Sequence, residues 1–319
     1  MKGKMEPLRT LRDLDRERKE VYNTEPLSRS RRKGDPAMRR RLLPVLFAAL
    51  MLPCGLAPVH AQPRLSFGVV SDIQWSNKET SGAMDYRGSL SRLQLCVDAL
   101  NLEKVAFVVQ LGDFIDGWEG DAVRSGADVD TVLKVFNRLK STKIHVAGNH
   151  CYRATPQVLL KKWKLKKLYY DFTVPSGKGW RFLVLDGNDA GYGVMGQAQL
   201  AWLQKTLALA SKKKERVIVF CHFPLLREAS PNHRLNNPEA VLPILERAGC
   251  VAAYIAGHDH AGGYTEQKGI HHITLTGLVE HPGKVSYAMM QVYDDRLKEL
   301  GFGDEPVRTC ILAAPTTGK

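Results

Sequence analysis

Residues 108–117, Val-Val-Gln-Leu-Gly-Asp-Phe-Ile-Asp-Gly, place a carboxylate directly after a run of apolar and β-branched side chains. The run predicts a buried strand that ends at Gly112. Asp113 therefore lies at the carboxyl end of a strand, where open α/β sheets gather loop side chains and bind ligands. A carboxylate in such a place is costly to remove from water unless it meets a cation or hydrogen-bond donors. The sequence thus predicts a partner for Asp113 elsewhere in the chain.

The alternation of strands with helices recurs from residue 65 to residue 292 and defines the fold class. Predicted strands cover residues 65–70, 105–111, 143–146, 169–174, 180–185, 216–221, 251–255, 271–276 and 285–292, and predicted helices cover residues 89–102, 129–139, 156–168, 197–210 and 238–247. Asn237 is predicted to cap the last helix. Strand pairs mixed with strand–helix units favour two mixed β-sheets flanked by helices over one doubly wound sheet. We therefore expect a four-layer αββα sandwich of the α/β (α+β) class.

The amino-terminal segment differs in composition from the rest of the chain. Residues 1–37 are polar and charge-mixed, which is typical of a non-native or disordered extension. Residues 38–61 combine a basic start, an apolar stretch and a small-x-small end, the pattern of a secretory signal peptide cleaved after Ala61. Prolines and a short apolar length argue against a membrane anchor. We expect Met38 to be the true start and residues 62–319 to form one exported domain, periplasmic or extracellular, by a general or a twin-arginine route.

Charge and cysteine content narrow the function classes. The chain has a formal net charge of +13, and residues 1–61, with 14 Lys or Arg and 7 Asp or Glu, hold just over half of that excess. The remaining positive charge suits an anionic substrate. No basic stripe with interleaved aromatic residues is present, so we expect no nucleic-acid partner. The five cysteines after residue 61 are odd in number and irregularly spaced, which argues against a disulfide scaffold.

Five predicted strand ends carry side chains of the metal-binding type. They are Asp72 with Gln74, Asp113, Asn149 with His150, His222, and His258 with His260. Each has a simple structural alternative when taken singly, such as a helix cap, a turn or a satisfied core histidine. Together they supply carboxylates, amides and imidazoles, a set sufficient for two metal ions that share one bridging ligand.

These segments resemble the calcineurin-like metallophosphoesterase superfamily. The resemblance rests on Asp72-x-Gln74, Gly112-Asp113-x-x-Asp116-Gly117, Gly148-Asn149-His150, His222 before Phe-Pro, and Gly257-His258-x-His260, in that order. Most of the superfamily has Asp-x-His at the first motif. The glutamine found here, with residues 257–264 and 271–275, is most similar to the manganese-dependent ADP-ribose/CDP-alcohol diphosphatase branch.

The resemblance implies a role for each residue. One metal ion would be held by Asp72, Gln74, Asp113 and His260, and the other by Asp113, Asn149, His222 and His258. His150 would be catalytic without being a ligand, either as a general acid or as a charge that stabilises phosphoryl oxygens. The resemblance also implies two divalent metal ions, Mn²⁺ first, with Fe or Zn as alternatives. The amide oxygen of Gln74 makes its site harder, and harder oxygen ligands suit Mn²⁺ better than Zn²⁺.

One position departs from the family pattern. The residue after the catalytic histidine is normally acidic in that family, and here it is Cys151. An acidic neighbour can orient an imidazole and raise its pKa. Either His150 is less basic in this chain or another carboxylate replaces the missing one. A Cys151→Asp variant is accordingly expected to raise the activity or to shift its optimum to alkaline pH.

Three further residues are weaker candidates. Arg87 could contact a phosphate group, with a surface or capping role as the alternative. Tyr264 follows Gly262 and Gly263, close to the predicted metal ions. It could stack on a base or a ribose, or could be a wall residue. Asp116 is predicted to hydrogen-bond within the loop that follows Asp113. Substrate choice is expected to depend on residues 75–88, 117–130, 187–196 and 225–237.

The leading functional hypothesis is an exported Mn²⁺-dependent hydrolase. It would cleave the phosphoanhydride of nucleoside-diphosphate-X substrates such as ADP-ribose or a CDP-alcohol, using a water activated by two metal ions. The alternatives are a broad phosphomonoesterase or cyclic-nucleotide phosphodiesterase on the same metal core, and a catalytically weakened metal- or nucleotide-binding protein. The expected partner is a small phosphorylated or nucleotide substrate. We expect a monomer with no stable membrane association after signal cleavage.

Overall fold

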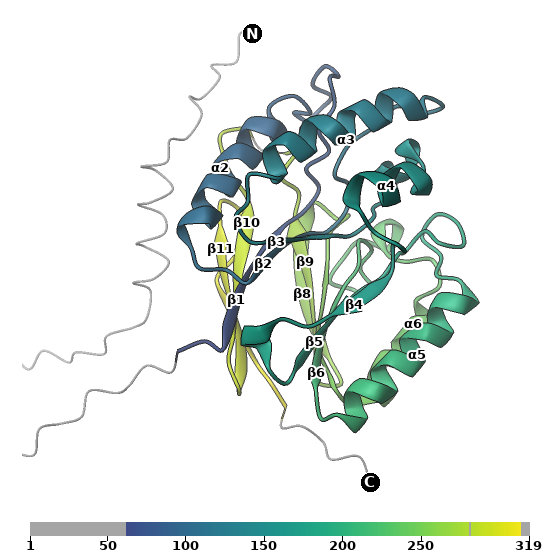
Figure 1. Ribbon diagram of the computed structural model, residues 1–319, viewed down its shortest axis with the longest axis vertical. Coiled ribbons are helices and arrows are strands. Elements are labelled where there is room, and N and C mark those ends of the chain that lie inside the picture. The colour runs from purple at the N-terminus through teal and green to yellow at the C-terminus, as the bar shows by residue number, and fades with distance from the viewer. Residues whose placement is uncertain (1–61, 281, 314–319) are drawn as a thin grey trace, which may run out of the picture.

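The computed structural model describes residues 62–280 and 282–313, and within them two β-sheets stack face to face with helices on their outer faces (Figure 1). The first sheet has the order β12-β11-β10-β1-β2-β3, and the second has the order β4-β5-β6-β7-β9-β8. The predicted four-layer αββα sandwich is confirmed. The predicted extension at residues 1–37 and the predicted signal peptide at residues 38–61 lie outside the described residues.

Both sheets are mixed, and their parallel strands determine where the site forms. The strands of the first sheet are β1 (Leu65–Val70), β2 (Phe107–Gln110), β3 (Thr142–His145), β10 (Tyr287–Val292), β11 (Arg296–Phe302) and β12 (Arg308–Ile311), and those of the second are β4 (Tyr170–Phe172), β5 (Trp180–Val184), β6 (Arg216–Phe220), β7 (Val251–Ala256), β8 (Ala261–Gln267) and β9 (Ile270–Thr276). Strands β1, β2 and β3 run parallel, as do β5, β6, β7 and β9. The carboxyl ends of parallel strands meet at one edge of their sheet, so the polar residues that follow them gather there.

Three apolar layers hold the sandwich together. Helices α2 (Ser89–Leu102), α3 (Ala122–Phe136) and α4 (Pro156–Trp163) cover the first sheet, and α5 (Gln197–Lys212) and α6 (Pro238–Ala248) cover the second (Figure 1). Between the sheets, Phe67 stacks on Phe107 with ring centroids 4.8 Å apart, and the edge of Phe182 meets Phe107 at 4.9 Å. All three rings are fully buried. This rigid aromatic centre fixes the two sheet edges relative to each other.

The structure also corrects several predicted elements. β1 and α2 have the predicted bounds, but α3 begins at Ala122 because the Asp121 carboxylate accepts the Arg124 N–H and caps the helix. The predicted strands omitted β8, β11 and β12, which complete the two sheets. Asn237 precedes α6 but its side chain does not cap it; it bonds instead to the backbone N–H and carbonyl of Met195.

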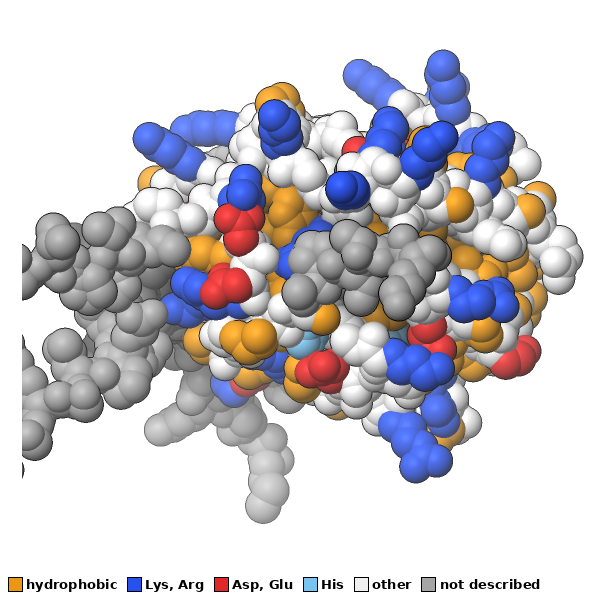
Figure 2. All heavy atoms as spheres, turned by 90° about the horizontal axis from the view of Figure 1, so that it is seen from below, with side chains coloured by type: hydrophobic (Ala, Val, Ile, Leu, Met, Phe, Trp, Pro, Cys, Tyr) orange, Lys and Arg blue, Asp and Glu red, His pale blue; other side chains and the backbone are white. Residues whose placement is uncertain are grey.

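The surface of the described part is basic, and its cysteines are unpaired. On the face seen in Figure 2, Lys and Arg side chains are spread widely and outnumber Asp and Glu. The five described cysteines are all free thiols, as predicted. Within residues 62–280 and 282–313, no helix combines the length and apolar character needed to cross a membrane.

Candidate metal centre

The predicted ligands converge from the strand ends of both sheets. Asp72 and Gln74 follow β1, Asp113 follows β2, and Asn149 follows β3, all in the first sheet; His222 follows β6, and His258 and His260 follow β7 in the second. Because the two parallel edges lie against each other, residues nearly 190 positions apart in the chain come within hydrogen-bond distance.

The first predicted ligand set forms a compact group around Asp113. The Nε2 atom of Gln74 lies 3.1 Å from Asp113 Oδ2 and 3.5 Å from Nε2 of His260. Nε2 of His260 lies 3.4 Å from Asp72 Oδ1. These four side chains therefore present their polar atoms to one common point.

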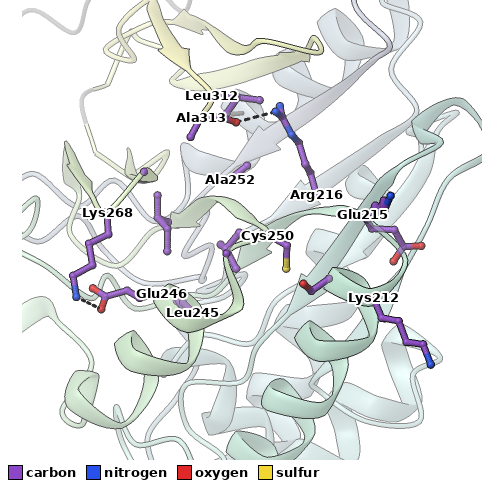
Figure 3. A pocket seen from close by; sticks show the side chains of 16 residues that line it. Lys212, Glu215, Arg216, Leu245, Glu246, Cys250, Ala252, Lys268, Leu312 and Ala313 are labelled. Carbon is purple, nitrogen blue, oxygen red and sulfur yellow. Dashed lines mark hydrogen bonds and ion pairs between the residues drawn. The ribbon is translucent and has the colours of Figure 1, made fainter. Parts of the chain in front are cut away.

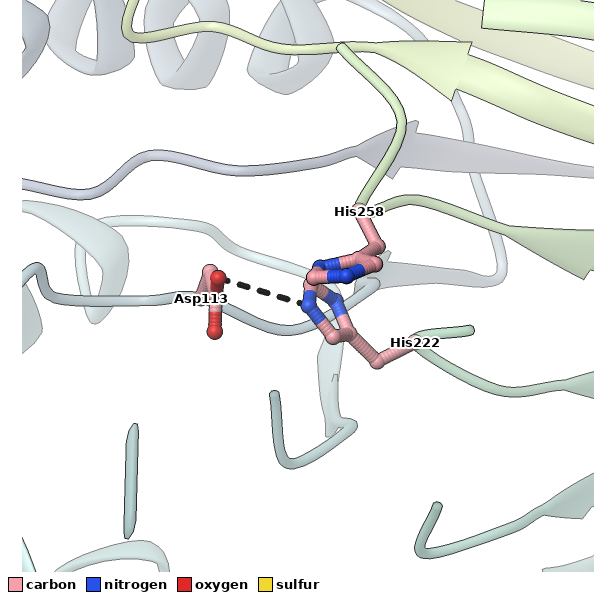
Figure 4. A group of neighbouring side chains, drawn as sticks. All are labelled: Asp113, His222 and His258. Atoms are coloured by element: carbon pink, nitrogen blue, oxygen red, sulfur yellow. Dashed lines mark ion pairs between the residues drawn. The ribbon is translucent and has the colours of Figure 1, made fainter. Parts of the chain in front are cut away.

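The second predicted ligand set shares Asp113 with the first. His222 Nε2 lies 3.3 Å from Asp113 Oδ2 and 3.1 Å from Asn149 Oδ1. Ligand atoms of Asp113, His222 and His258 lie within 4.8 Å of one another, with both imidazoles directed to the carboxylate (Figure 4). Asp113 consequently touches both sets, as the bridging role requires.

Electrostatics around Asp113 favour its charged form. Burial of this fully enclosed side chain raises its pKa, but the neighbouring imidazoles of His222 and His150 lower it more, so the carboxyl pKa lies well below its usual range. Its Oδ1 atom also accepts the backbone N–H of His150 at 2.9 Å. The carboxylate is thus held ionised at a point where cationic partners are gathered.

A buried oxygen atom shows that the site suits a metal. Gln74 Oε1 is inaccessible to solvent and has no hydrogen-bond partner among the described residues, and buried Asp72 Oδ1 meets only the His260 imidazole, at 3.4 Å. A buried polar atom left unpaired costs free energy, and such groups are rare in folded proteins. Oxygen atoms from carboxylates and amides, mixed with imidazole nitrogens, form a donor set that fits a hard divalent ion such as Mn²⁺.

The backbone at the candidate ligands is strained. Asp72, Gln74, Asp113 and His258 adopt φ angles of 50°, 40°, 43° and 67°, in the left-handed region that favours glycine. Each such residue costs on the order of 1–3 kcal/mol and persists where surrounding structure enforces it, commonly at functional sites. The fold thus retains an unfavourable local conformation at four of seven predicted ligands.

Two glycines leave the space that the carboxylates occupy. A Cβ atom at Gly148 would lie 2.2 Å from Asp113 Oδ1, and one at Gly257 would lie 2.6 Å from Asp72 Oδ2. Since neither distance is physically possible, a side chain at either glycine would displace a carboxylate. The glycines of the Gly-Asn-His and Gly-His motifs are therefore required by close packing.

Contacts behind the imidazoles orient them toward the centre. His222 Nδ1 lies 3.0 Å from the Leu111 carbonyl oxygen, and His260 Nδ1 lies 2.9 Å from Glu280 Oε1. Such partners fix the tautomer and leave the opposite nitrogen for a metal. Burial lowers the pKa of His260, but the carboxylates of Asp72 and Glu280 raise it to about 10. Glu280 was not predicted as part of the site, because no sequence pattern places it there.

His150 lies beside the ligand sets. Its Nε2 atom is 3.9 Å from Asp113 Oδ2, and its Nδ1 atom is 3.0 Å from Asp116 Oδ1 and 3.1 Å from the Asp116 carbonyl oxygen. Burial lowers the pKa of His150, but the charges of Asp113 and Asp116 raise it overall. Asp116 therefore reaches beyond its own loop, which corrects the predicted role, and supplies the carboxylate that position 151 lacks.

Cys151 packs into the apolar core beside the loop that carries Asp113. Its side chain is fully buried in the core beneath α3 and α4, and its sulfur accepts the Phe114 N–H at 3.3 Å. Burial raises the pKa of the thiol to about 12, so it remains protonated. A carboxylate at this position would enter an apolar core, and the expectation that Cys151→Asp raises activity is not supported.

The centre opens into a cavity of about 500 Å³. Its lining comprises Gln74, Met84, Asp113, His150, His233, His258, Asp259, His260, Ala261 and Glu280. Met84 and His233 come from two of the four segments expected to govern substrate choice. A volume of this size accommodates a small phosphorylated molecule.

Arg87 and Tyr264 are not among the residues that line this cavity. The Arg87 guanidinium is exposed and pairs with Glu79 at 2.6 Å. The Tyr264 hydroxyl lies 3.0 Å from His271 Nδ1, and Arg308 lies over its ring at 4.7 Å. The alternatives, a surface ion pair for Arg87 and a wall residue for Tyr264, describe these contacts better than a substrate contact does.

Several neighbours of the site were not predicted from the sequence. The Tyr192 hydroxyl lies 3.3 Å from His258 Nε2, and His233 Nδ1 lies 3.4 Å from Asp259 Oδ1. Arg153 Nη1 lies 2.7 Å from His150 Nδ1. Tyr192 and His233 fall in segments expected to contact substrate, whereas nothing in the sequence distinguishes Arg153 from other surface arginines.

A second cavity, of about 720 Å³, lies away from the metal centre and carries no comparable chemistry (Figure 3). Two of its cations are already engaged: Lys268 pairs with Glu246 at 2.7 Å, and Arg216 donates to the Ala313 carbonyl oxygen at 2.9 Å. The smaller cavity is therefore the candidate active site.

Comparisons with known proteins agree with this geometry. A family model described as calcineurin-like phosphoesterase matches residues 65–262. The manganese-dependent ADP-ribose/CDP-alcohol diphosphatase of Arabidopsis thaliana is 30% identical over 75% of this chain and 94% of its own, and that of Xenopus laevis is 26% identical over 76% and 89%. The crystal structure of a dimetal phosphatase from Danio rerio superimposes with a TM-score of 0.71 and 28% identity, covering 79% of this chain and all of that one.

Proposed function

Because this chain belongs to the calcineurin-like phosphoesterase family, we propose that it is a Mn²⁺-dependent hydrolase of nucleoside-diphosphate-X substrates such as ADP-ribose or a CDP-alcohol. The observation that carries the proposal is Gln74, whose side-chain amide contacts Asp113 and His260 and whose buried oxygen has no hydrogen-bond partner among the described residues. The relatives that share most of the chain's length are named for that activity and that metal. The products would be two phosphomonoesters.

The residues divide into two overlapping ligand sets. Asp72, Gln74, Asp113 and His260 would hold one ion, and Asp113, Asn149, His222 and His258 would hold the other. When bound, the ions would lower the pKa of a water molecule and neutralise charge on the phosphoryl group. The chain's own contribution is to hold Asp113 ionised between the two sets and to exclude water behind it.

His150 is positioned to handle the leaving group. The Asp116 carboxylate accepts a hydrogen bond from Nδ1–H of His150. This contact leaves Nε2 directed to the metal side of the cavity. A protonated Nε2 can donate its proton to the oxygen that leaves the attacked phosphorus, and its charge can stabilise phosphoryl oxygens before that transfer. His150→Asn should therefore reduce kcat by about 100-fold or more while the metal content is retained.

Metal analysis tests the choice of cofactor. The purified enzyme is stripped with a chelator, reconstituted with Mn²⁺, Zn²⁺ or Fe²⁺, and assayed for bound metal and activity. We expect Mn²⁺ to restore the most activity because Gln74 replaces an imidazole by a harder amide oxygen. Strong activation by Zn²⁺ with none by Mn²⁺ would count against the assignment.

A substrate panel tests the reaction. With Mn²⁺ present, kcat/KM is compared for ADP-ribose, CDP-choline, 2′,3′-cyclic AMP and p-nitrophenyl phosphate. The proposal expects the two diphosphates to be preferred. A preference for p-nitrophenyl phosphate would support a phosphomonoesterase instead, and a preference for the cyclic nucleotide would support a phosphodiesterase.

We also propose that the protein is exported and acts as a monomer after cleavage of residues 38–61. The basic, apolar and small-x-small pattern of that segment supports this proposal, as does β1, which begins at Leu65, shortly after the proposed cleavage point. Amino-terminal sequencing of the exported protein should start at Gln62. Retention of the apolar segment in a membrane fraction would contradict the proposal, and light scattering of the exported protein tests the monomeric state.

A further inference from the structure

Two cations converge on one buried carboxylate beside His150. Lys78 Nζ contacts Asp116 Oδ2 and the Gly117 carbonyl oxygen. Arg153 Nη1 lies 3.6 Å from Asp116 Oδ1 and donates to the Asp116 carbonyl oxygen at 2.6 Å. The same Nη1 atom is 2.7 Å from His150 Nδ1. Asp116 thus joins the catalytic histidine to a basic pair that the metal ligands do not include.

The basic pair has hydrogen-bond donors that no described residue accepts. Lys78 and Arg153 both lie at the carboxylate of Asp116, on the Nδ1 side of His150. The side chains of Lys78 and Arg153 are 26% and 30% exposed, whereas Asp116 is 5% exposed beneath them. Arginine carries five N–H donors, and among the described residues only Nη1 of Arg153 makes a hydrogen bond. The remaining donors are free to bind an anion.

Aromatic contacts hold Lys78 in place. Its Nζ atom lies 4.8 Å from the ring centroid of Trp118 and 5.9 Å from that of Tyr86. Trp118 is fixed in turn, because its Nε1–H donates to Asp128 Oδ2 at 2.9 Å. Lys78 is therefore a positioned cation.

The position of the pair relative to the metal centre suggests its ligand. Lys78 and Arg153 stand behind His150, which lines the cavity while they do not, with His150 Nε2 3.9 Å from Asp113 Oδ2 and His150 Nδ1 2.7 Å from Arg153 Nη1. In a diphosphate the two phosphoryl groups share one bridging oxygen, so the second lies within a few ångström of the first. A phosphoryl group bound at Asp113 would place its neighbour beside His150, which Lys78 and Arg153 flank through Asp116.

We propose that Lys78 and Arg153 bind the second phosphoryl group of a diphosphate substrate, the group that leaves. This inference rests on the proposed function. Water adds to the attacked phosphorus, and the bond from that phosphorus to the bridging oxygen breaks. The bridging oxygen departs with the second phosphoryl group and takes the His150 proton, and the water's proton is released. The charge that develops on the departing oxygen lies close to both cations.

The test compares substrates that differ in the second phosphate. Lys78→Met and Arg153→Met are made in the full Mn²⁺-loaded enzyme, and kcat/KM is measured for ADP-ribose and CDP-choline against p-nitrophenyl phosphate and thymidine 5′-p-nitrophenyl phosphate. The ratio of diphosphate to single-phosphate kcat/KM should fall about 10- to 100-fold in each variant, as expected for loss of a charge-assisted hydrogen bond. Arg153→Lys should recover part of the ratio, since it keeps the charge but loses the planar donors.

Matched controls separate this effect from general damage. Arg138 and Lys162 form ion pairs with Asp98 and Asp130 outside the cavity lining, and Arg138→Met and Lys162→Met should leave the ratio unchanged. Arg153 contacts His150, so a change at Arg153 can lower kcat/KM for every substrate. The ratio of diphosphate to single-phosphate kcat/KM is therefore the readout. A wild-type preference for diphosphates that both Lys78→Met and Arg153→Met retain would overturn the subsite alone. A wild-type preference for single-phosphate substrates would overturn the proposed function and the subsite with it.

Discussion

Asp113 is the residue on which both halves of the centre depend. It is fully buried and touches Gln74 at 3.1 Å and His222 at 3.3 Å, each from a different ligand set. Asp113→Asn keeps the shape but removes the negative charge that both ions would share. We expect loss of at least one bound metal and a fall in kcat/KM of about 100-fold or more, since even outer-shell changes cost 10- to 100-fold. Metal content per protein and activity measure this, and a variant with two ions and full activity would refute the bridging role.

Cys151 is a packing residue at the position where the family resemblance implies an acidic side chain. An aspartate there would place a carboxylate in the apolar core under α3, close to the charge of Asp113. We expect Cys151→Asp to lower the free energy of unfolding by about 3 kcal/mol or more, as for an unpaired buried charge. Thermal unfolding measures the change. Cys250→Asp is the matched control, because that thiol is only partly buried and should cost less.

A change in activity without loss of stability in Cys151→Asp would restore the original expectation that this position tunes His150. The structure argues otherwise, because the carboxylate at His150 Nδ1 already comes from Asp116. Sequence reasoning left open whether another carboxylate substitutes. It could not identify Asp116, because that role depends on the loop after β2 folding back over the turn that carries His150.

The turns that follow the strands leave space for the carboxylates because they contain glycine. A Cβ atom at Gly148 would lie 2.3 Å from the Asp113 backbone nitrogen as well as against its carboxylate. Gly148→Ala should therefore shift the turn after β2, reduce metal affinity about 10- to 100-fold and lower the melting temperature. Calorimetric titration with Mn²⁺ measures the affinity.

Gly126 provides the control for that prediction. It lies inside α3, and a Cβ atom there would meet nothing closer than 3.5 Å. Gly126→Ala should raise the free energy of unfolding by about 0.5–1 kcal/mol, because alanine loses less backbone entropy in a helix. Equal Mn²⁺ affinity in Gly148→Ala and Gly126→Ala would show that the turn tolerates a side chain.

The strand β11 carries a carboxyl group that should make stability depend on pH. Glu299 is fully buried, and burial together with the charge of Glu305 raises its pKa to about 8, against the opposing charge of Arg308 at 3.0 Å. The native state therefore keeps a proton that the unfolded chain releases near pH 4.5. The free energy of unfolding should fall as pH rises from about 5 to about 8.

Glu299→Gln cannot ionise, so its melting temperature should fall less than that of the wild type between pH 6 and pH 9. Unfolding is measured with chelator present, which removes any contribution from the metal centre. Glu266→Gln, at an exposed position in β8, should keep the wild-type slope. Parallel curves for the wild type and Glu299→Gln would mean that Glu299 is ionised in the folded protein.

Most elements could be predicted because their apolar patterns are regular. β1 and α2 have clear periodicity, and the ligands follow buried strands where a sheet edge must gather them. β8, β11 and β12 lack this signal. β8 begins Ala-Gly-Gly and has no buried residue, and β12 presents Thr309 and Ile311 to solvent, so these two edge strands form through pairing with a neighbour and not through their own pattern.

The side-chain contacts within the metal centre could not be predicted from the sequence, for a different reason. The pairing of Tyr192 with His258 and of Arg153 with His150 depends on loops that approach from separate sheets. No short spacing records such contacts. The contact between Arg153 and His150 can be recognised only when the turn that holds both residues is known. By sequence position alone, Arg87 is the more obvious candidate for a phosphate contact.

The candidate metal centre joins the two β-sheets. Asp72, Asp113 and Asn149 come from the first sheet, and His222, His258 and His260 come from the second. Bound ions would therefore bridge the halves of the sandwich and neutralise two buried carboxylates. Mn²⁺ at about 100 times its dissociation constant should raise the free energy of unfolding by about 2.7 kcal/mol, because the unfolded chain does not present the ligands together.

Thermal unfolding after chelation and then during Mn²⁺ titration measures this stabilisation. The melting temperature should drop when the ions are removed and recover in step with activity, because the same ligands serve both. Asp113→Asn should lose most of the increment, since it disconnects the two sets, whereas Gly126→Ala should keep all of it. Full recovery of activity with no rise in melting temperature would mean that the ions bind without linking the sheets, and the shared role of Asp113 would then have to be abandoned.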